Sequence, residues 1–235
     1  MKKIAFLGSY DNIDMLLYLG KIMTDLGKRV LIIDGTVMQK ARYTVPAIET
    51  MAMAYVTEFE GIDVAVGFKN ARTLFADMGI NSYEELRYDM VLIDVDTFPG
   101  YINFELQNVY KTYFVTGFDN YTLKRGLETL IGLDEPVKMT KILYSKNMLK
   151  EEDEYLDFLS KDFPVEWAKE KIYFPFDQGD QSVINENQRL SRIKFRYLTS
   201  QYKDSLGYLA EEILLDENVS SRDVKNVIRR IEKGA

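Results

Sequence analysis

The sequence predicts a three-layer α/β/α fold with a mostly parallel sheet. Short apolar runs without polar alternation recur along the chain, as expected for strands that are buried on both faces. Segments with apolar residues at helical spacing separate these runs. The 235 residues, 46% of them hydrophobic, are enough for one compact domain. We expect this domain over residues 1–216, followed by an amphipathic helical tail over residues 217–235.

The first predicted unit is a strand, a tight loop and a helix. The apolar run at residues 3–8 leads into a polar loop at residues 8–12, and apolar residues then follow helical spacing over residues 13–26. A second buried run at residues 29–33 ends at Asp34. Together these segments predict one βαβ unit.

The alternation of strands and helices continues to the end of the chain. Further strands are predicted at residues 62–66, 90–93, 113–116, 141–144 and 172–174, and helices at residues 71–78, 123–131, 151–160 and 195–215. Ligands of open parallel sheets bind outside the carboxyl ends of the strands. The loop 8–12, Asp34 and the segment 94–100 should therefore lie along one functional edge.

Composition excludes several classes of chemistry. Without Cys or His, the chain has no disulfides, no thiolate or imidazole metal ligands and no Ser-His-Asp triad. A formal net charge of −7 argues against broad, charge-driven binding to nucleic acid. No stretch approaches the roughly 18 apolar residues of a membrane span. We expect a cytoplasmic protein.

Several blocks in the predicted order resemble one known family. The segment Leu7-Gly8-Ser9-Tyr10-Asp11-Asn12-Ile13 stands where a phosphate loop would stand, and Leu26-Gly27 closes the first helix. The run YDMVLID at residues 88–94 precedes Pro99-Gly100. In order and spacing, the chain resembles the ParA/MinD family of deviant Walker P-loop ATPases over most of its length. The resemblance implies a nucleotide-switch fold whose relatives bind Mg-ATP at this loop.

The loop itself departs from the family motif K-G-G-V-G-K-[ST]. Only Gly8 matches, because Leu7 replaces the first Lys, and Ser9 and Asp11 replace the second and third glycines. Asn12 stands at the phosphate-binding Lys, and Ile13 stands at the Ser/Thr that binds magnesium. The resemblance therefore implies a degenerate nucleotide site from which binding is lost, formed by Gly8, Ser9, Asp11, Asn12, Ile13, Asp34, Asp94, Pro99 and Gly100.

Acidic residues add to this departure. Asp11 or Asp14 is expected to cap the first helix, so that the protein's own carboxylate takes the place of an anion. Asp34, Asp94 and Asp96 could hold a hard cation, but we favour solvated strand-end carboxylates and no metal site. The expected cofactor is none. The alternative is Mg-ATP held by a rearranged loop, with Lys2, Lys3 or Lys40 supplying charge.

The sequence of the tail predicts an amphipathic helix. A capping signal at residues 220–223 precedes apolar residues that fall on one helical face with basic residues around them. These apolar residues are Val224, Val227, Ile228 and Ile231. MinD-like proteins end in a helix similar in kind, but this one lacks the Phe, Trp or Leu that anchor an interfacial helix. Packing on the domain or on a partner is favoured over peripheral attachment to a membrane.

A local basic stretch contains Arg189, Arg192, Lys194 and Arg196, in a region where some ParA-like proteins bind DNA. A solvated basic face is favoured, because four charges on an acidic chain bind nucleic acid only weakly.

Taken together, these features predict a non-catalytic, ParA/MinD-like pseudo-ATPase. We expect a scaffold or positioning protein in a larger bacterial assembly, such as partition, polar positioning, pilus or secretion machinery. Its expected partners are proteins of that assembly, including an active ParA/MinD-like relative or a second copy of the chain. The alternatives are a divergent Mg-ATP-binding ATPase and a DNA-binding partition protein.

Overall fold

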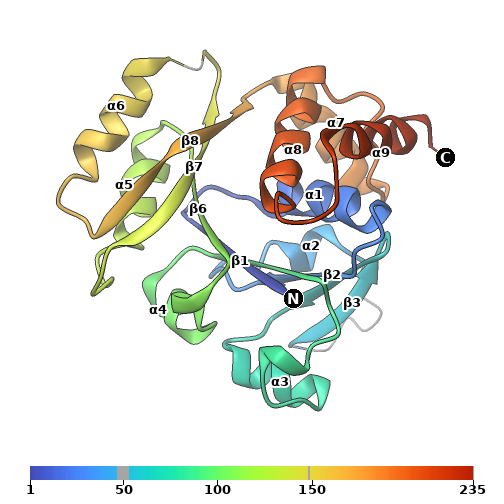
Figure 1. Cartoon of the computed structure of the whole chain (residues 1–235), viewed down its shortest axis with the longest axis horizontal. Helices are drawn as coiled ribbons and strands as arrows, with labels where there is room; N and C mark the ends of the chain where they lie inside the picture. The colour runs from blue at the N-terminus through green and yellow to red at the C-terminus, as the bar shows by residue number, and fades with distance from the viewer. Residues whose placement is uncertain (47–52, 148, 235) are drawn as a thin grey trace.

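A single sheet forms the centre of the molecule in the computed structural model, which describes residues 1–46, 53–147 and 149–234 (Figure 1). Its eight strands follow the order β3-β4-β2-β5-β1-β6-β7-β8, and all neighbours are parallel except β3 and β4. The strands are β1 (Lys2–Leu7), β2 (Val30–Asp34), β3 (Tyr55–Phe59), β4 (Ile62–Val66), β5 (Met90–Val95), β6 (Lys111–Thr116), β7 (Val137–Ser145) and β8 (Val165–Pro175). The predicted mostly parallel sheet is confirmed.

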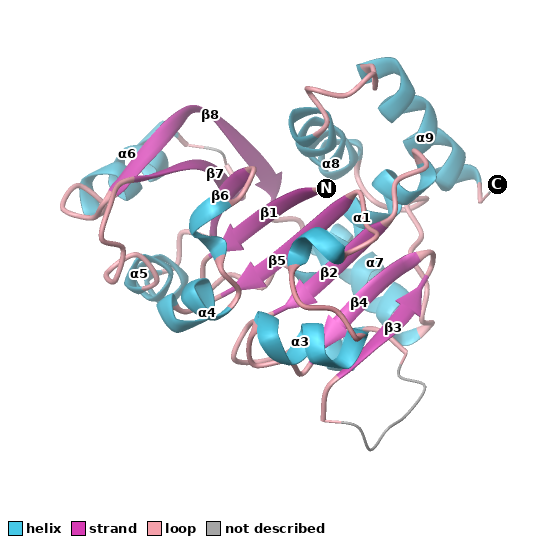
Figure 2. Cartoon of the chain, turned by 60° about the horizontal axis from the view of Figure 1, so that its bottom comes forward, coloured by secondary structure: helices cyan, strands magenta, loops and turns pink. Residues whose placement is uncertain are grey.

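Helices cover both faces of the sheet (Figure 2). Each face has its own apolar core. One face packs against α1 (Ile13–Asp25), α7 (Gln178–Arg189), α8 (Ser200–Ile213) and α9 (Ser221–Lys233). The other packs against α3 (Ala71–Met78), α4 (Phe98–Asn103), α5 (Asn120–Glu128) and α6 (Lys150–Leu159). A short α2 (Ala41–Thr44) and two 3₁₀ turns, η1 (Tyr83–Glu85) and η2 (Leu106–Asn108), complete the described elements. This arrangement is the predicted three-layer architecture.

The last predicted helix of the domain begins later than expected. Helix α8 starts at Ser200 instead of residue 195, because Thr199 is its N-cap and accepts the backbone N–H of Tyr202. Asp180 fixes this cap, since its carboxylate accepts both the N–H and the hydroxyl of Thr199, at 2.6 and 2.7 Å. Residues 195–199 therefore approach the sheet as a loop, with Phe195 fully buried.

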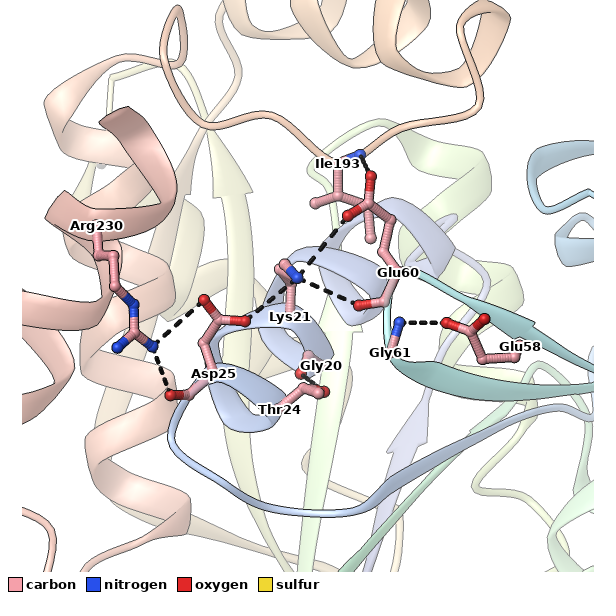
Figure 3. A network of polar contacts seen from close by, with 9 residues as sticks. All are labelled: Gly20, Lys21, Thr24, Asp25, Glu58, Glu60, Gly61, Ile193 and Arg230. Carbon is pink, nitrogen blue, oxygen red and sulfur yellow. Dashed lines mark hydrogen bonds and ion pairs between the residues drawn. The ribbon is translucent and has the colours of Figure 1, made fainter. Parts of the chain in front are cut away.

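The C-terminal helix α9 is joined to the domain by polar contacts as well as by its apolar face. The guanidinium of Arg230 donates to the backbone carbonyl of Asp25 at 2.7 Å (Figure 3). The ammonium of Lys21 lies 3.2 Å from the Asp25 carboxylate and 3.8 Å from the Glu60 carboxylate. Glu60 in turn accepts the N–H of Ile193. One chain of contacts thus links α9, α1, the β3–β4 turn and the loop before α8.

Candidate functional site at the carboxyl edge of the sheet

The carboxyl ends of β1, β2 and β5 bring the predicted site residues together. In the parallel register, Asp94 lies beside Phe6 of β1 on one side and beside Asp34 of β2 on the other. The N–H of Gly8, the first residue after β1, donates to the carbonyl of Val95 at 3.2 Å. The loop 8–12, Asp34 and Asp94 therefore share one edge, as the strand pattern predicts.

The loop after β1 is fixed against its neighbours. Gly8 has a φ of +144°, and a Cβ atom on this residue would lie 2.0 Å from the carbonyl oxygen of Val115 in β6. The hydroxyl of Ser9 donates to the carbonyl of Thr122 at 2.9 Å. The ring of Tyr10 stacks on that of Tyr144, with 4.0 Å between their centroids. The path of the loop is thus set by contacts with β6, α5 and β7.

A buried hydrogen bond joins the loop to β5. The side-chain amide of Asn12 donates from Nδ2 to Oδ1 of Asp94 at 2.8 Å, and the two residues are 0% and 3% exposed. Burial raises the pKa of Asp94 well above its usual range, and the neighbouring Asp34 carboxylate raises it further, while the Asn12 amide opposes both effects. Asn12 Oδ1 is buried without a hydrogen-bond partner among the described residues. Asn12 and Asp94 therefore form a closed contact at the centre of the edge.

The other two carboxylates of this edge are held by backbone and hydroxyl donors. Asp34, 2% exposed, accepts the N–H and hydroxyl of Thr36 and the N–H of Ala41. Asp96 accepts the N–H of Val37 at 2.9 Å. Burial is the main cause that raises the pKa of both carboxyls. The expectation of solvated strand-end carboxylates is wrong for Asp34 and Asp94, because β2 and β5 are covered on both faces. Within the described ranges, no group of three or more acidic residues is placed to hold a metal ion.

The expected aspartate cap on α1 is also wrong. The N-cap of α1 is Asn12, whose side chain makes no capping hydrogen bond. Asp11 forms an ion pair with Lys40. Asp14 accepts both hydrogen bonds from the amide of Gln188 in α7, at 2.8 and 2.9 Å. Partners on other elements, rather than the first turn of α1, thus hold the two carboxylates.

The three lysines suggested as a source of positive charge for the loop lie in different places. Lys2 and Lys3 are at the start of β1, so the length of the strand separates them from the loop. There Lys2 donates to the carbonyl of Ile213 and Lys3 to that of Glu105. The suggestion that either lysine supplies charge to the loop is therefore wrong. Lys40 does lie at the loop, where it is paired with Asp11, and burial lowers its pKa.

Pro99 and Gly100 form the start of α4, where the hydroxyl of Thr97 accepts the N–H of Gly100 at 3.1 Å. Gly100 is buried close to the Val95 side chain. These two residues follow β5 at the same edge and turn the chain onto the sheet.

The apolar face of α9 lies against the domain. Its side chains are at most 9% exposed and belong to the core formed with α1 and α8, and they are Val224, Val227, Ile228 and Ile231. The predicted capping signal is present as a capping box between Ser220 and Asp223. With α9 in this position, its apolar face contacts the protein itself. No helix in the described part of the chain is long and apolar enough to cross a membrane.

The arginines of the basic stretch have different partners. Arg192 pairs with Glu186 at 2.8 Å and donates to Asn187, while the guanidinium of Arg196 lies over the ring of Tyr197. Ile193 and Phe195, between these cations, are buried. Arg189 is the last residue of α7, and residues 192–196 form a loop in which buried and more exposed residues alternate.

Solved structures share this architecture. A putative plasmid partition protein from Borrelia burgdorferi B31, solved with AMPPNP, matches with a TM-score of 0.55 at 9% identity, over 92% of this chain and 98% of its own. MinD of Aquifex aeolicus, solved in complex with MinC, matches with a TM-score of 0.55 at 12% identity, over 100% of this chain and 97% of its own. The chain has the ParA/MinD fold. A ParA family ATPase from Chlorobium tepidum TLS matches with a TM-score of 0.52 at 12% identity, over 97% of this chain and 96% of its own.

These matches are matches of structure at low sequence identity. No family model matches the sequence, and no curated protein matches it.

Proposed function

We propose that the chain is a ParA/MinD-like pseudo-ATPase, which keeps the nucleotide-switch fold without binding or hydrolysing Mg-ATP. It acts as a scaffold or positioning protein within a larger bacterial assembly. The buried hydrogen bond from Asn12 to Asp94 carries the proposal, because it joins the position of the family's phosphate-binding lysine to a carboxylate at the site.

The residues present do not fit a Mg-nucleotide. The relatives' motif has a lysine where Asn12 stands and a Ser/Thr where Ile13 stands, and the Ile13 side chain is 1% exposed in the core and offers no oxygen. A phosphate at the loop would add negative charge at the edge where Asp34 and Asp94 lie side by side. Lys40 is already neutralised by Asp11. Since phosphoryl transfer depends on positioned cations, their loss removes the basis for both binding and hydrolysis.

Exposed apolar side chains beside the same edge support a protein partner. Val37, Met38 and Tyr43 surround the start of α2 and are 68%, 76% and 81% exposed, and Met53 is 80% exposed. Large apolar groups gathered on a surface typically mark an interaction site. The occurrence of the Aquifex aeolicus neighbour in a complex with MinC is consistent with a protein partner of this kind. We propose an active ParA/MinD-like relative, a second copy of the chain or another protein of the assembly as the partner.

The molar mass in solution, with and without Mg-ATP, tests this proposal. Light scattering coupled to size-exclusion chromatography should give the same mass in both conditions, whether the chain is a monomer or a constitutive dimer. A dimer that forms only with nucleotide would overturn the proposal.

The enzyme alternative is a divergent ATPase that binds Mg-ATP through a rearranged loop. Its one favourable observation is the place of Lys40 beside the loop. It predicts measurable turnover that Lys40→Ala weakens and Asp94→Ala abolishes. The pseudo-ATPase predicts no turnover above the background of a heat-inactivated sample.

A further inference from the structure

A large open groove lies at the opposite edge of the sheet from the loop 8–12. It has a volume of 1140 Å³ and is lined by the first residues of β6 and β7, among them Lys111, Thr112 and Lys138. Its walls come from α4 on one face of the sheet and from α8 on the other. Ligand pockets usually occupy about 300–1,000 Å³, so this groove is large enough for a segment of polypeptide.

The walls of the groove are partly apolar. The lining includes apolar residues from α4, from α8 and from the connections around them: Phe98, Tyr101 and Ile102 of α4, Tyr208 of α8, and Leu133 and Leu215 of the connections. Tyr208 is 45% exposed and Leu215 is 74% exposed. Tyr208, Leu215 and Ile102, which is 44% exposed, are therefore accessible to another molecule.

The charged groups of the lining are mainly acidic. It contains five carboxylates and two lysines, and one of the lysines, Lys111, is already paired with Glu212 at 2.8 Å. The side chains of Asp134, Glu135 and Glu170 are exposed and have neither a hydrogen bond nor an ion pair with any described residue. The groove thus combines unpaired negative charge with aromatic surface, which attracts cations by both Coulomb and cation–π interactions.

A bulge in β8, the last strand in the sheet order, positions part of this lining. Met139 of β7 is opposite Trp167 of β8, and Lys141 is opposite Lys171, so residues 168–170 face the single residue Thr140. Bulges interrupt the regular ladder and often lie next to functional sites, where they redirect side chains. Here Ala168, Glu170 and Thr140 all line the groove.

We infer that this groove binds a partner protein through a segment in which Lys or Arg alternates with apolar residues. Basic side chains of the segment would pair with Glu135, Asp134 and Glu170, and its apolar side chains would contact Tyr208 and Leu215. The groove and the loop 8–12 lie at opposite ends of the strands, so this inference is independent of whether nucleotide binds.

The test uses the full chain and a fluorescein-labelled 12-residue peptide of alternating Lys and Leu, followed by fluorescence anisotropy without nucleotide. We expect saturable binding, with no binding of a peptide of alternating Glu and Leu. The double variant Glu135→Gln/Glu170→Gln should bind the basic peptide at least about fivefold more weakly, because it removes two ion pairs.

A second double variant controls for net charge. Asp77→Asn/Glu151→Gln removes two exposed carboxylates from α3 and α6, outside the groove lining, and should bind like the original chain. Equal weakening in both double variants would show nonspecific attraction to an acidic protein and would overturn the inference. Absence of saturable binding to the original chain would overturn it too.

Discussion

Replacement of Gly8 by Ala tests whether the loop after β1 is fixed in the described path. The substitution acts in two ways, because the φ of +144° is unfavourable for any residue with a Cβ, and the new Cβ would meet the Val115 carbonyl oxygen at 2.0 Å. Backbone strain of this kind costs about 1–3 kcal/mol, and overpacking against a fixed neighbour costs about another 1–3 kcal/mol. We therefore expect Gly8→Ala to lower the free energy of unfolding by about 2–6 kcal/mol.

The control is Gly27→Ala. Gly27 also has a positive φ, of +84°, but a Cβ there would have no atom within 4 Å, so this variant measures backbone strain alone. The two variants should differ by at least about 1 kcal/mol, which is about 2–4 °C in Tm for a chain of this size. Urea denaturation and thermal unfolding, both followed by circular dichroism, measure the difference. If Gly8→Ala is no more destabilising than Gly27→Ala, the loop is not pressed against β6 and its fixed position is refuted.

Three further predictions concern the buried carboxylate, the last helix and the basic stretch. Folding raises the pKa of Asp94. The native state therefore binds a proton at this carboxyl more tightly than the unfolded state does. The stability that this proton contributes at acid pH is lost as the pH rises from the unfolded-state pKa through the folded-state pKa. Asp94→Asn should accordingly raise Tm more at pH 8 than at pH 4, and an equal effect at both would contradict the burial argument. Ile231→Ala removes a side chain that is 5% exposed between α9 and the domain and should cost about 2–5 kcal/mol in urea denaturation, whereas a loss below about 0.5 kcal/mol would mean that α9 is undocked in solution. The chain should pass through a column of nonspecific duplex DNA at about 50 mM salt, and retention that Arg192→Ala/Arg196→Ala abolishes would favour the partition alternative.

Most strands of the central sheet could be predicted from the sequence. The runs at residues 62–66 and 71–78 coincide with β4 and α3, because buried parallel strands and amphipathic helices have distinct periodicities. Strand β8 begins at Val165, whereas only residues 172–174 are predicted, since its first half is polar and contains the bulge. Strand β3 was not predicted, and it pairs with β4 through a tight turn at residues 60–61.

The site could be placed from the sequence, but its contacts could not. Strand order predicts that the loop 8–12 and Asp94 share an edge. The bond between Asn12 and Asp94 spans 82 residues, and the pairing of Asp11 with Lys40 spans 29. Local capping preference favours an aspartate at the helix start, and the tertiary partner Lys40 overrides it. An amide in place of the motif lysine was the one local signal for the closed contact.

Titration of the purified chain with ATP, ADP and GTP, each with magnesium, tests the pseudo-ATPase proposal most directly. The proposal predicts no heat by calorimetry and no shift of Tm at millimolar nucleotide, because it takes the buried hydrogen bond between Asn12 and Asp94 to replace the contacts of a nucleotide. Saturable binding with a Kd below about 100 μM, equivalent to about −5.5 kcal/mol, would contradict the proposal and show that the loop has been rebuilt to hold nucleotide.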